Sequence, residues 1–117
     1  MTFTALERAI LRHYHEAYSD RGFPGLEALR VRRREETELG CLVYLQALGR
    51  TDLPDWQCLL PENEALVVEL PDGGELTADV YISGGKPVLL EIYGRRRALE
   101  AAPRLGFRLA QRRVLAA

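Results

Sequence analysis

Residues 78–94, ADVYISGGKPVLLEIYG, decide the fold: they contain two short runs of strand-forming residues joined at a pair of glycines. In each run an apolar side chain occupies every second position, which is the period of a strand that buries one face. Two antiparallel strands with this pattern share a core only if both apolar faces lie on the same side of the sheet. We therefore expect a hairpin whose loop length satisfies that condition.

The length of this loop follows from the parity of the register. A two-residue loop at residues 84–85, the usual form for a glycine dipeptide, would place Glu91 on the core face. A three-residue loop at residues 83–85 exchanges the faces of one strand. This loop pairs Val80 with Val88 and Ala78 with Leu90. We predict the three-residue loop, with Gly85 in the left-handed position of a bulged turn.

The preceding hairpin follows from the same argument. Apolar residues alternate over residues 66–70, and Pro71-Asp72-Gly73 supplies turn-forming residues. A three-residue loop pairs Val68 with Leu76 and sets Glu69 opposite Glu75, a like-charge pair with a small cost. A five-residue loop of the same parity is the alternative. Either loop gives a three-stranded antiparallel meander over residues 64–94.

The N-terminal segment predicts one amphipathic helix over residues 4–19. Thr4 and Glu7 form a capping-box pattern, and apolar residues then recur at helical spacing. Gly22 suits the left-handed position after a helix end, and Pro24 closes the element. The apolar stripe of this helix requires a sheet to cover.

Residues 26–46 favour a short helical turn followed by a hairpin, with a helix over residues 26–36 as the open alternative. We expect the turn at 26–29, an edge-like strand at about 30–36, and a second strand at 39–46. The second strand has one buried side. That side is formed by Leu39, Cys41, Val43 and Leu45.

The C-terminal segment, residues 95–117, is basic. It carries seven arginines and one glutamate, a net charge of +6, whereas residues 1–94 carry 9 basic and 16 acidic side chains, a net charge of −7. Pro103 forbids one continuous helix there. Leu105, Phe107 and Leu109 alternate with other residues, so a last short strand is an open alternative for residues 98–113.

The whole chain of 117 residues is expected to form a single domain of the α+β class. The architecture is one N-terminal helix packed on an antiparallel sheet of about five strands, the N-terminal hairpin plus the meander. No apolar run reaches membrane-spanning length and no signal peptide is visible, which favours the cytoplasm. Cys41 and Cys58 match no metal or redox spacing, so we expect core thiols and no cofactor or metal.

Two blocks carry a resemblance to known families. Residues 31–45, VRRREETELGCLVYL, and residues 80–93, VYISGGKPVLLEIY, resemble small bacterial α+β families of unknown function that end in a hairpin with a Gly-rich turn and Leu-Glu-x-Tyr. They are also similar to some immunity-type proteins. The resemblance implies a helix on an antiparallel sheet and no established activity.

The polar face of the central hairpin carries the candidate site. In the predicted register Thr77 lies opposite Glu91 and Glu75 opposite Tyr93, with Asp79 diagonal to Glu91. Asp79 and Glu91 are the candidate catalytic pair, since close carboxylates perturb each other's pKa values and perform acid/base chemistry. The same face offers Tyr81, Leu89, Glu91 and Tyr93 as candidate binding residues.

Three functions compete. The first is a non-enzymatic protein-interaction module that binds a toxin-like partner or a second copy through this face, where aromatic side chains mix with charges. The second is nucleic-acid binding through the C-terminal arginines. These are Arg95, Arg96, Arg97, Arg104, Arg108, Arg112 and Arg113. The third is an enzyme or small-molecule carrier with a pocket near His13, Tyr14 and Trp56.

Overall fold

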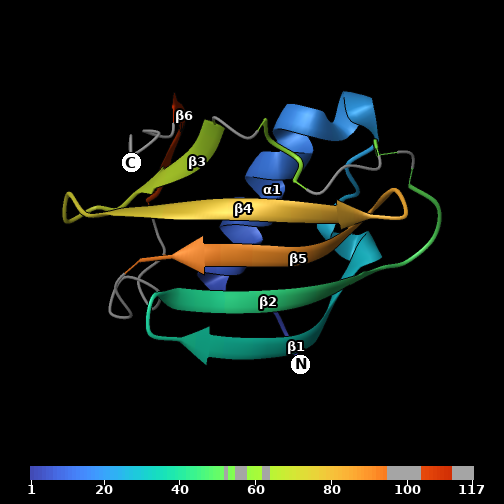
Figure 1. Ribbon diagram of the computed structural model, residues 1–117, viewed down its shortest axis with the longest axis horizontal. Helices are drawn as coiled ribbons and strands as arrows, with labels where there is room; N and C mark the ends of the chain where they lie inside the picture. The colour runs from blue at the N-terminus through green and yellow to red at the C-terminus, as the bar shows by residue number, and fades with distance from the viewer. Residues whose placement is uncertain (52, 55–57, 62–63, 95–103, 112–117) are drawn as a thin grey trace, which may run out of the picture.

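The computed structural model describes residues 1–51, 53–54, 58–61, 64–94 and 104–111. Within these residues one helix, α1 (Ala5–Tyr18), packs on one face of a six-stranded antiparallel sheet (Figure 1). The strands are β1 (Leu29–Thr37), β2 (Gly40–Ala47), β3 (Glu64–Glu69), β4 (Glu75–Ser83), β5 (Lys86–Tyr93) and β6 (Gly106–Gln111), and their spatial order is β1-β2-β5-β4-β3-β6. The α+β prediction is confirmed, with one strand more than the five expected.

Helix α1 begins at the predicted capping box. The Glu7 amide donates to Thr4 Oγ1 at 3.1 Å, and the Thr4 amide donates to Glu7 Oε1 at 2.9 Å. A short 3-10 turn, η1 (Ser19–Arg21), follows α1, and Gly22 then adopts a left-handed φ of 97° as expected. The buried stripe faces the sheet, where the Tyr14 hydroxyl donates to the Ala78 carbonyl at 2.6 Å.

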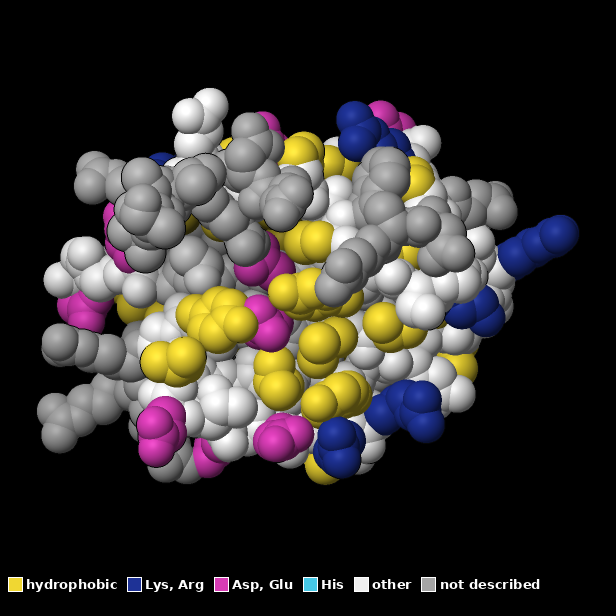
Figure 2. All heavy atoms as spheres, in the orientation of Figure 1, with side chains coloured by type: hydrophobic (Ala, Val, Ile, Leu, Met, Phe, Trp, Pro, Cys, Tyr) yellow, Lys and Arg dark blue, Asp and Glu magenta, His cyan; other side chains and the backbone are white. Residues whose placement is uncertain are grey.

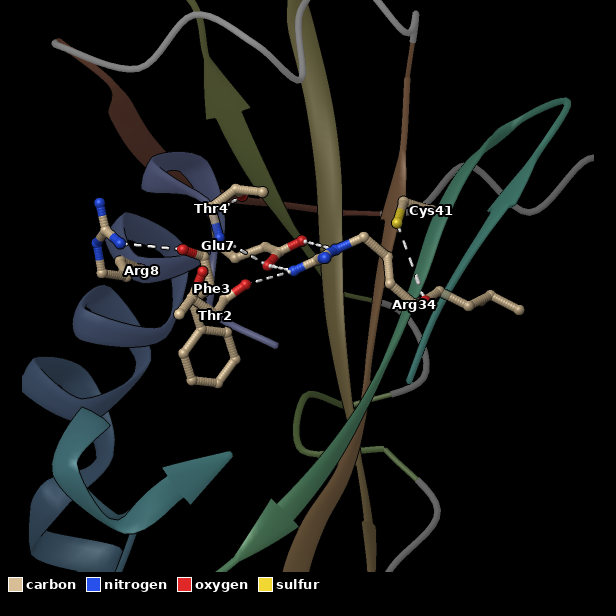
Figure 3. Close-up of polar contacts among 8 residues, drawn as sticks. Thr2, Phe3, Thr4, Glu7, Arg8, Arg34 and Cys41 are labelled. Carbon is tan, nitrogen blue, oxygen red and sulfur yellow. Dashed lines mark hydrogen bonds and ion pairs between the residues drawn. The ribbon is translucent and has the colours of Figure 1, made fainter. Parts of the chain in front are cut away.

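Glu7 also connects the helix to the sheet. Arg34, from edge strand β1, reaches across to the first turn of α1, and its guanidinium donates to both carboxylate oxygens of Glu7 (Figure 3). The same guanidinium donates to the Thr2 carbonyl at 3.0 Å. The cap of α1 and the outermost strand therefore share one buried carboxylate.

The N-terminal hairpin forms largely as predicted. A 3-10 turn, η2 (Leu26–Ala28), precedes β1, and β1 lies at the edge of the sheet beside β2. The exception is Leu39, which was expected on the buried side but is 69% exposed. The chain reverses at Leu39, so the alternation of buried side chains in β2 starts only at Cys41.

The first loop of the meander has the predicted register. Val68 pairs with Leu76 and Glu69 pairs with Glu75, and the Leu70 amide donates to the Gly74 carbonyl at 2.8 Å to close a three-residue loop. The like-charge pair is compensated by a strand that comes later in the chain. Arg108 of β6 donates to both glutamates, at 2.8 Å to Glu69 and 2.6 Å to Glu75.

The second loop of the meander corrects the prediction. Ser83 pairs directly with Lys86, so the loop contains only Gly84 and Gly85 rather than three residues. Their φ angles are 61° and 74°, and positive values at both positions are typical of a type I′ turn, whose twist matches that of the strands.

A β-bulge keeps the faces of this hairpin in phase. Tyr81 pairs with Leu89 and Ile82 with Pro87, which leaves Val88 as the extra residue. Beyond the bulge, Val80 pairs with Leu90 rather than Val88, and Ala78 pairs with Ile92 rather than Leu90. Leu90 and Ile92 lie on the predicted core face, but their predicted partners were wrong by two residues. Val88 was expected on the core face too, and it is instead half-buried at the bulge, where Pro87 is buried.

Strand β6 extends the sheet at the edge of β3, which resolves residues 106–111 in favour of a strand. Phe107 of β6 stacks on His13 of α1, with ring centroids 4.4 Å apart. Desolvation lowers the pKa of His13, so the neutral ring is favoured in this stack. Cys41 is buried and Cys58 is half-buried, in agreement with their expected place in or near the core.

Candidate functional site

The sheet face away from α1, here called the open face, carries the predicted site residues. Figure 1 shows α1 behind the strands, so the open face points toward the viewer. In the same view, Figure 2 shows hydrophobic side chains gathered over the middle of this face, acidic side chains among them and to the left, and basic side chains at the lower right. A solvated sheet face requires only polar residues, so this apolar cluster needs an explanation.

The register places the two candidate carboxylates closer than predicted. Asp79 lies directly opposite Glu91 rather than diagonal to it, and Thr77 lies opposite Tyr93 rather than Glu91. The physical reason is the two-residue loop together with the bulge at Val88, since each moves the partners of β4 by one residue along β5 relative to the predicted register.

The surroundings of this pair do not suit acid/base catalysis. Asp79 is only 2% exposed, so a substrate has no access to its carboxylate. Glu91 accepts a hydrogen bond from the Tyr81 hydroxyl at 3.3 Å, and a second hydrogen bond from Tyr93 raises the pKa of that phenol to about 12. Burial, together with the carboxylates of Glu91 and Asp79, also raises the pKa of Tyr81. Both tyrosines therefore stay protonated at neutral pH and act as donors to Glu91.

Three strands contribute a continuous apolar row to the open face. Leu89 of β5 pairs with Tyr44 of β2 on one side and with Tyr81 of β4 on the other. All three side chains are half-buried. We call Tyr44, Leu89 and Tyr81 the apolar row, and Arg33 of β1 extends it because Arg33 pairs with Tyr44.

A parallel row lies two residues further along the strands and is acidic. It runs Glu35, Leu42, Glu91 and Asp79 across β1, β2, β5 and β4. We call this set the acidic row. The open face therefore presents an aromatic and aliphatic band that ends in a basic residue. Beside it lies a band with the carboxylates of Glu35 and Glu91 at the surface and that of Asp79 buried.

A groove of about 810 Å³ adjoins the apolar row. It lies where two β-bulges meet the open face, one at Arg32 in β1 and the other at Val88 in β5. The lining includes Arg32, Arg33, Tyr44, Tyr81, Val88 and Leu89. The Arg33 guanidinium lies over the Tyr44 ring, 4.3 Å from its centroid, in a cation–π contact.

Sequence reasoning found Tyr81, Leu89, Glu91 and Tyr93 but missed the contribution of β1 and β2. Arg33, Leu42 and Tyr44 join the site only because β2 pairs with β5. The alternation of Leu42 and Tyr44 with buried residues was visible in the sequence, and it placed both side chains on the face away from the core.

The nucleic-acid candidates lie mostly outside the described residues. This applies to Arg95, Arg96, Arg97, Arg112 and Arg113. Arg108 lies on the open face, but Glu69 and Glu75 both bind its guanidinium. Its charge is therefore already matched within the sheet.

A pocket was predicted near His13, Tyr14 and Trp56, and the structure gives two of these residues packing roles. Tyr14 is fully buried and bonded to a backbone carbonyl, and His13 packs on Phe107. Trp56 lies outside the described residues. Among the residues described, no three His, Cys, Asp or Glu side chains form a group that could hold a metal ion.

Comparisons with known proteins add no functional assignment. No family model, no curated protein and no solved structure matches the chain. In the described part of the chain, no helix is both long enough and apolar enough to cross a membrane.

Proposed function

We propose that this protein is a non-enzymatic interaction module that binds a protein partner through the open face. The observation that carries the proposal is the apolar row, in which Tyr44, Leu89 and Tyr81 lie side by side and half-exposed across three strands. Aromatic side chains flanked by charges are typical of protein interfaces and of the residues that dominate binding energy.

The rigid setting of these side chains supports the proposal. The apolar row lies on the inner strands β2, β5 and β4, each paired with a strand on either side. Side chains held on a sheet lose little further freedom on binding, so more of the contact energy appears as affinity. Tyr81 is also oriented by its hydrogen bond to Glu91.

Acid/base catalysis by Asp79 and Glu91 is the weaker candidate, because one carboxylate is buried and the other accepts from two phenols. Nucleic-acid binding by the C-terminal arginines has less support as well, since Arg108 is neutralised by two glutamates. The expected partner is a toxin-like protein, as the immunity-type resemblance implies, or a second copy.

The test compares proteins captured from a lysate of the protein's own cells by three immobilised baits. The baits are the wild type, Leu89→Asp in the apolar row, and Leu39→Asp as a control for an exposed leucine elsewhere. We expect a protein held by the wild type and by Leu39→Asp but lost with Leu89→Asp, with far-UV circular dichroism confirming that all three are folded. Light scattering of the purified chain tests self-association in the same three variants. If capture and mass are the same for all three, the open face is not an interface.

A further inference from the structure

We propose that the groove beside the apolar row binds an acidic peptide segment of the partner, with a carboxylate at Arg32 and Arg33 and an adjacent apolar side chain on the apolar row. This inference rests on the proposed function and names the chemistry of the partner. It follows from the bulge geometry, the charge balance and the shape of the groove.

The bulge in β1 gathers two consecutive arginines at one groove. In a regular strand neighbouring residues point to opposite faces. The register shift between Val31 and Arg33 makes Arg32 the extra residue, and bulges re-aim side chains in this way. Arg32 and Arg33 therefore both line the groove, although they are adjacent in sequence.

The positive charge at this point is not matched within the described part of the protein. Arg34, the next residue, already forms an ion pair with Glu7. Arg33 has one acidic neighbour, Glu35 at 3.7 Å, and both side chains are more than half exposed, so this ion pair is weak. Arg32 forms no ion pair with any described residue. A carboxylate from a partner would supply the missing counter-charge.

The neighbouring surface specifies what accompanies the carboxylate. The Arg33 guanidinium lies over the Tyr44 ring, and a planar guanidinium is suited to donate two parallel hydrogen bonds to a carboxylate. Leu89 and Tyr81 continue the same surface away from the arginines. An apolar side chain one or two residues from the acidic one reaches this surface.

Two observations favour a peptide over a nucleic acid or a small anion. The acidic row, with Glu35 and Glu91, lies directly beside the apolar row and repels an extended polyanion that runs past the two arginines. Arg32 and Arg33 are exposed and the other named lining residues are half-buried, so the groove is an open channel rather than an enclosed pocket. An extended chain with a single acidic residue fits both conditions.

The experiment selects binders from a displayed library of random peptides of about twelve residues, on the full-length protein. We expect enrichment of Asp or Glu beside Leu, Phe or Trp, and affinity that falls with rising NaCl. Fluorescence anisotropy of selected peptides should show at least about a tenfold loss for Arg32→Glu/Arg33→Glu. Arg12→Glu, a single reversal of the same kind at an exposed site on α1, should leave the affinity unchanged.

Other outcomes separate this inference from the proposed function. Selected peptides that lack acidic residues, bind Arg32→Glu/Arg33→Glu normally and fail on Leu89→Asp would overturn the acidic partner and leave the interaction face standing. If the wild type enriches peptides no more than the Leu89→Asp variant does, both the acidic-peptide inference and the proposed interaction face are overturned. Inorganic phosphate or a DNA oligonucleotide that binds more tightly than any peptide, and only when both arginines are present, would assign the groove to that ligand and overturn the inference. Self-association that the arginine double variant abolishes would assign it to a second copy, with the same consequence.

Discussion

Arg34 and Glu7 form a two-pronged ion pair that ties the edge strand of the sheet to the N-terminal cap of the helix, with the Glu7 side chain only 4% exposed. The same carboxylate accepts the Thr4 amide, so one side chain completes both the capping box and the ion pair (Figure 3). The hydrogen bond from Arg34 to Glu7 also raises the pKa of the guanidinium, which stays charged throughout the accessible pH range. Docking of α1 therefore depends on a residue from a distant strand.

Removal of this arginine should destabilise the protein far more than removal of its neighbour. Arg34→Met leaves a buried carboxylate without its cation, and we expect a loss of about 2–4 kcal/mol in the free energy of unfolding, less than for a fully buried pair because Arg34 is partly exposed. Arg33→Met, the matched control, breaks only an exposed pair and a surface cation–π contact, and should cost less than about 1 kcal/mol. Urea unfolding followed by circular dichroism measures both. Equal losses would show that the Arg34–Glu7 pair is not structurally important.

The two-residue turn between β4 and β5 requires a positive φ at Gly84, and substitutions at this residue test that requirement. Its φ of 61° is costly for alanine but acceptable for asparagine, so Gly84→Ala should lose about 1–2 kcal/mol while Gly84→Asn stays within about 0.5 kcal/mol of the wild type. A three-residue loop would place Gly84 in the right-handed region, where alanine is well tolerated. Thermal unfolding of the two variants decides between the loops, and a stable Gly84→Ala protein would contradict the observed turn.

The sequence was enough to predict which side chains of β4 and β5 face the core, except at Val88, but not which residues of the two strands pair with each other. Alternation of apolar residues requires only that the register keep a given parity. A three-residue loop and a two-residue loop with a bulge at Val88 both satisfy it, and they differ by two residues in pairing. Nothing local in the sequence marks Val88 as the extra residue.

The site was predicted only in part because it depends on contacts between the two hairpins. Tyr81 and Leu89 belong to one hairpin, so local pairing rules found them. Tyr44 and Arg33 belong to the other, and their place beside Leu89 follows from the pairing of β2 with β5. The burial pattern fixes the face of a strand but does not identify its neighbour in the sheet.

The hydrogen bond from Tyr93 to Glu91 should be visible in the ultraviolet titration of the tyrosines. The pKa of Tyr93 is raised to about 12 in the folded protein, above the ordinary value of 10. The protonated phenol is therefore favoured by folding, so its contribution to stability is complete below pH 10 and is lost as the pH rises toward 12. The component of the phenolate absorbance that titrates near pH 12 should be lost in Tyr93→Phe, and Glu91→Gln should move it to lower pH. A Tyr93 that titrates near pH 10 in the wild type would contradict the contact.

The effect of the paired glutamates on the stability of the sheet should depend on whether Arg108 is present. Glu69 and Glu75 lie directly opposite each other, and each accepts a hydrogen bond from Arg108. In the wild type, Glu75→Gln should lower the melting temperature because a charge-assisted bond to Arg108 is lost.

In an Arg108→Ala background the same Glu75→Gln change should raise the melting temperature, because it now relieves a cross-strand like-charge pair. Arg104→Ala, an exposed arginine just before β6, is the control background and should leave the sign of the effect as in the wild type. High salt should shrink both effects because it screens exposed charges. The reversal of sign is the decisive observation. If Glu75→Gln changes the melting temperature in the same direction with and without Arg108, the arginine does not compensate the glutamate pair, and β6 is held by its backbone pairing with β3 and by the stack of Phe107 on His13 of α1.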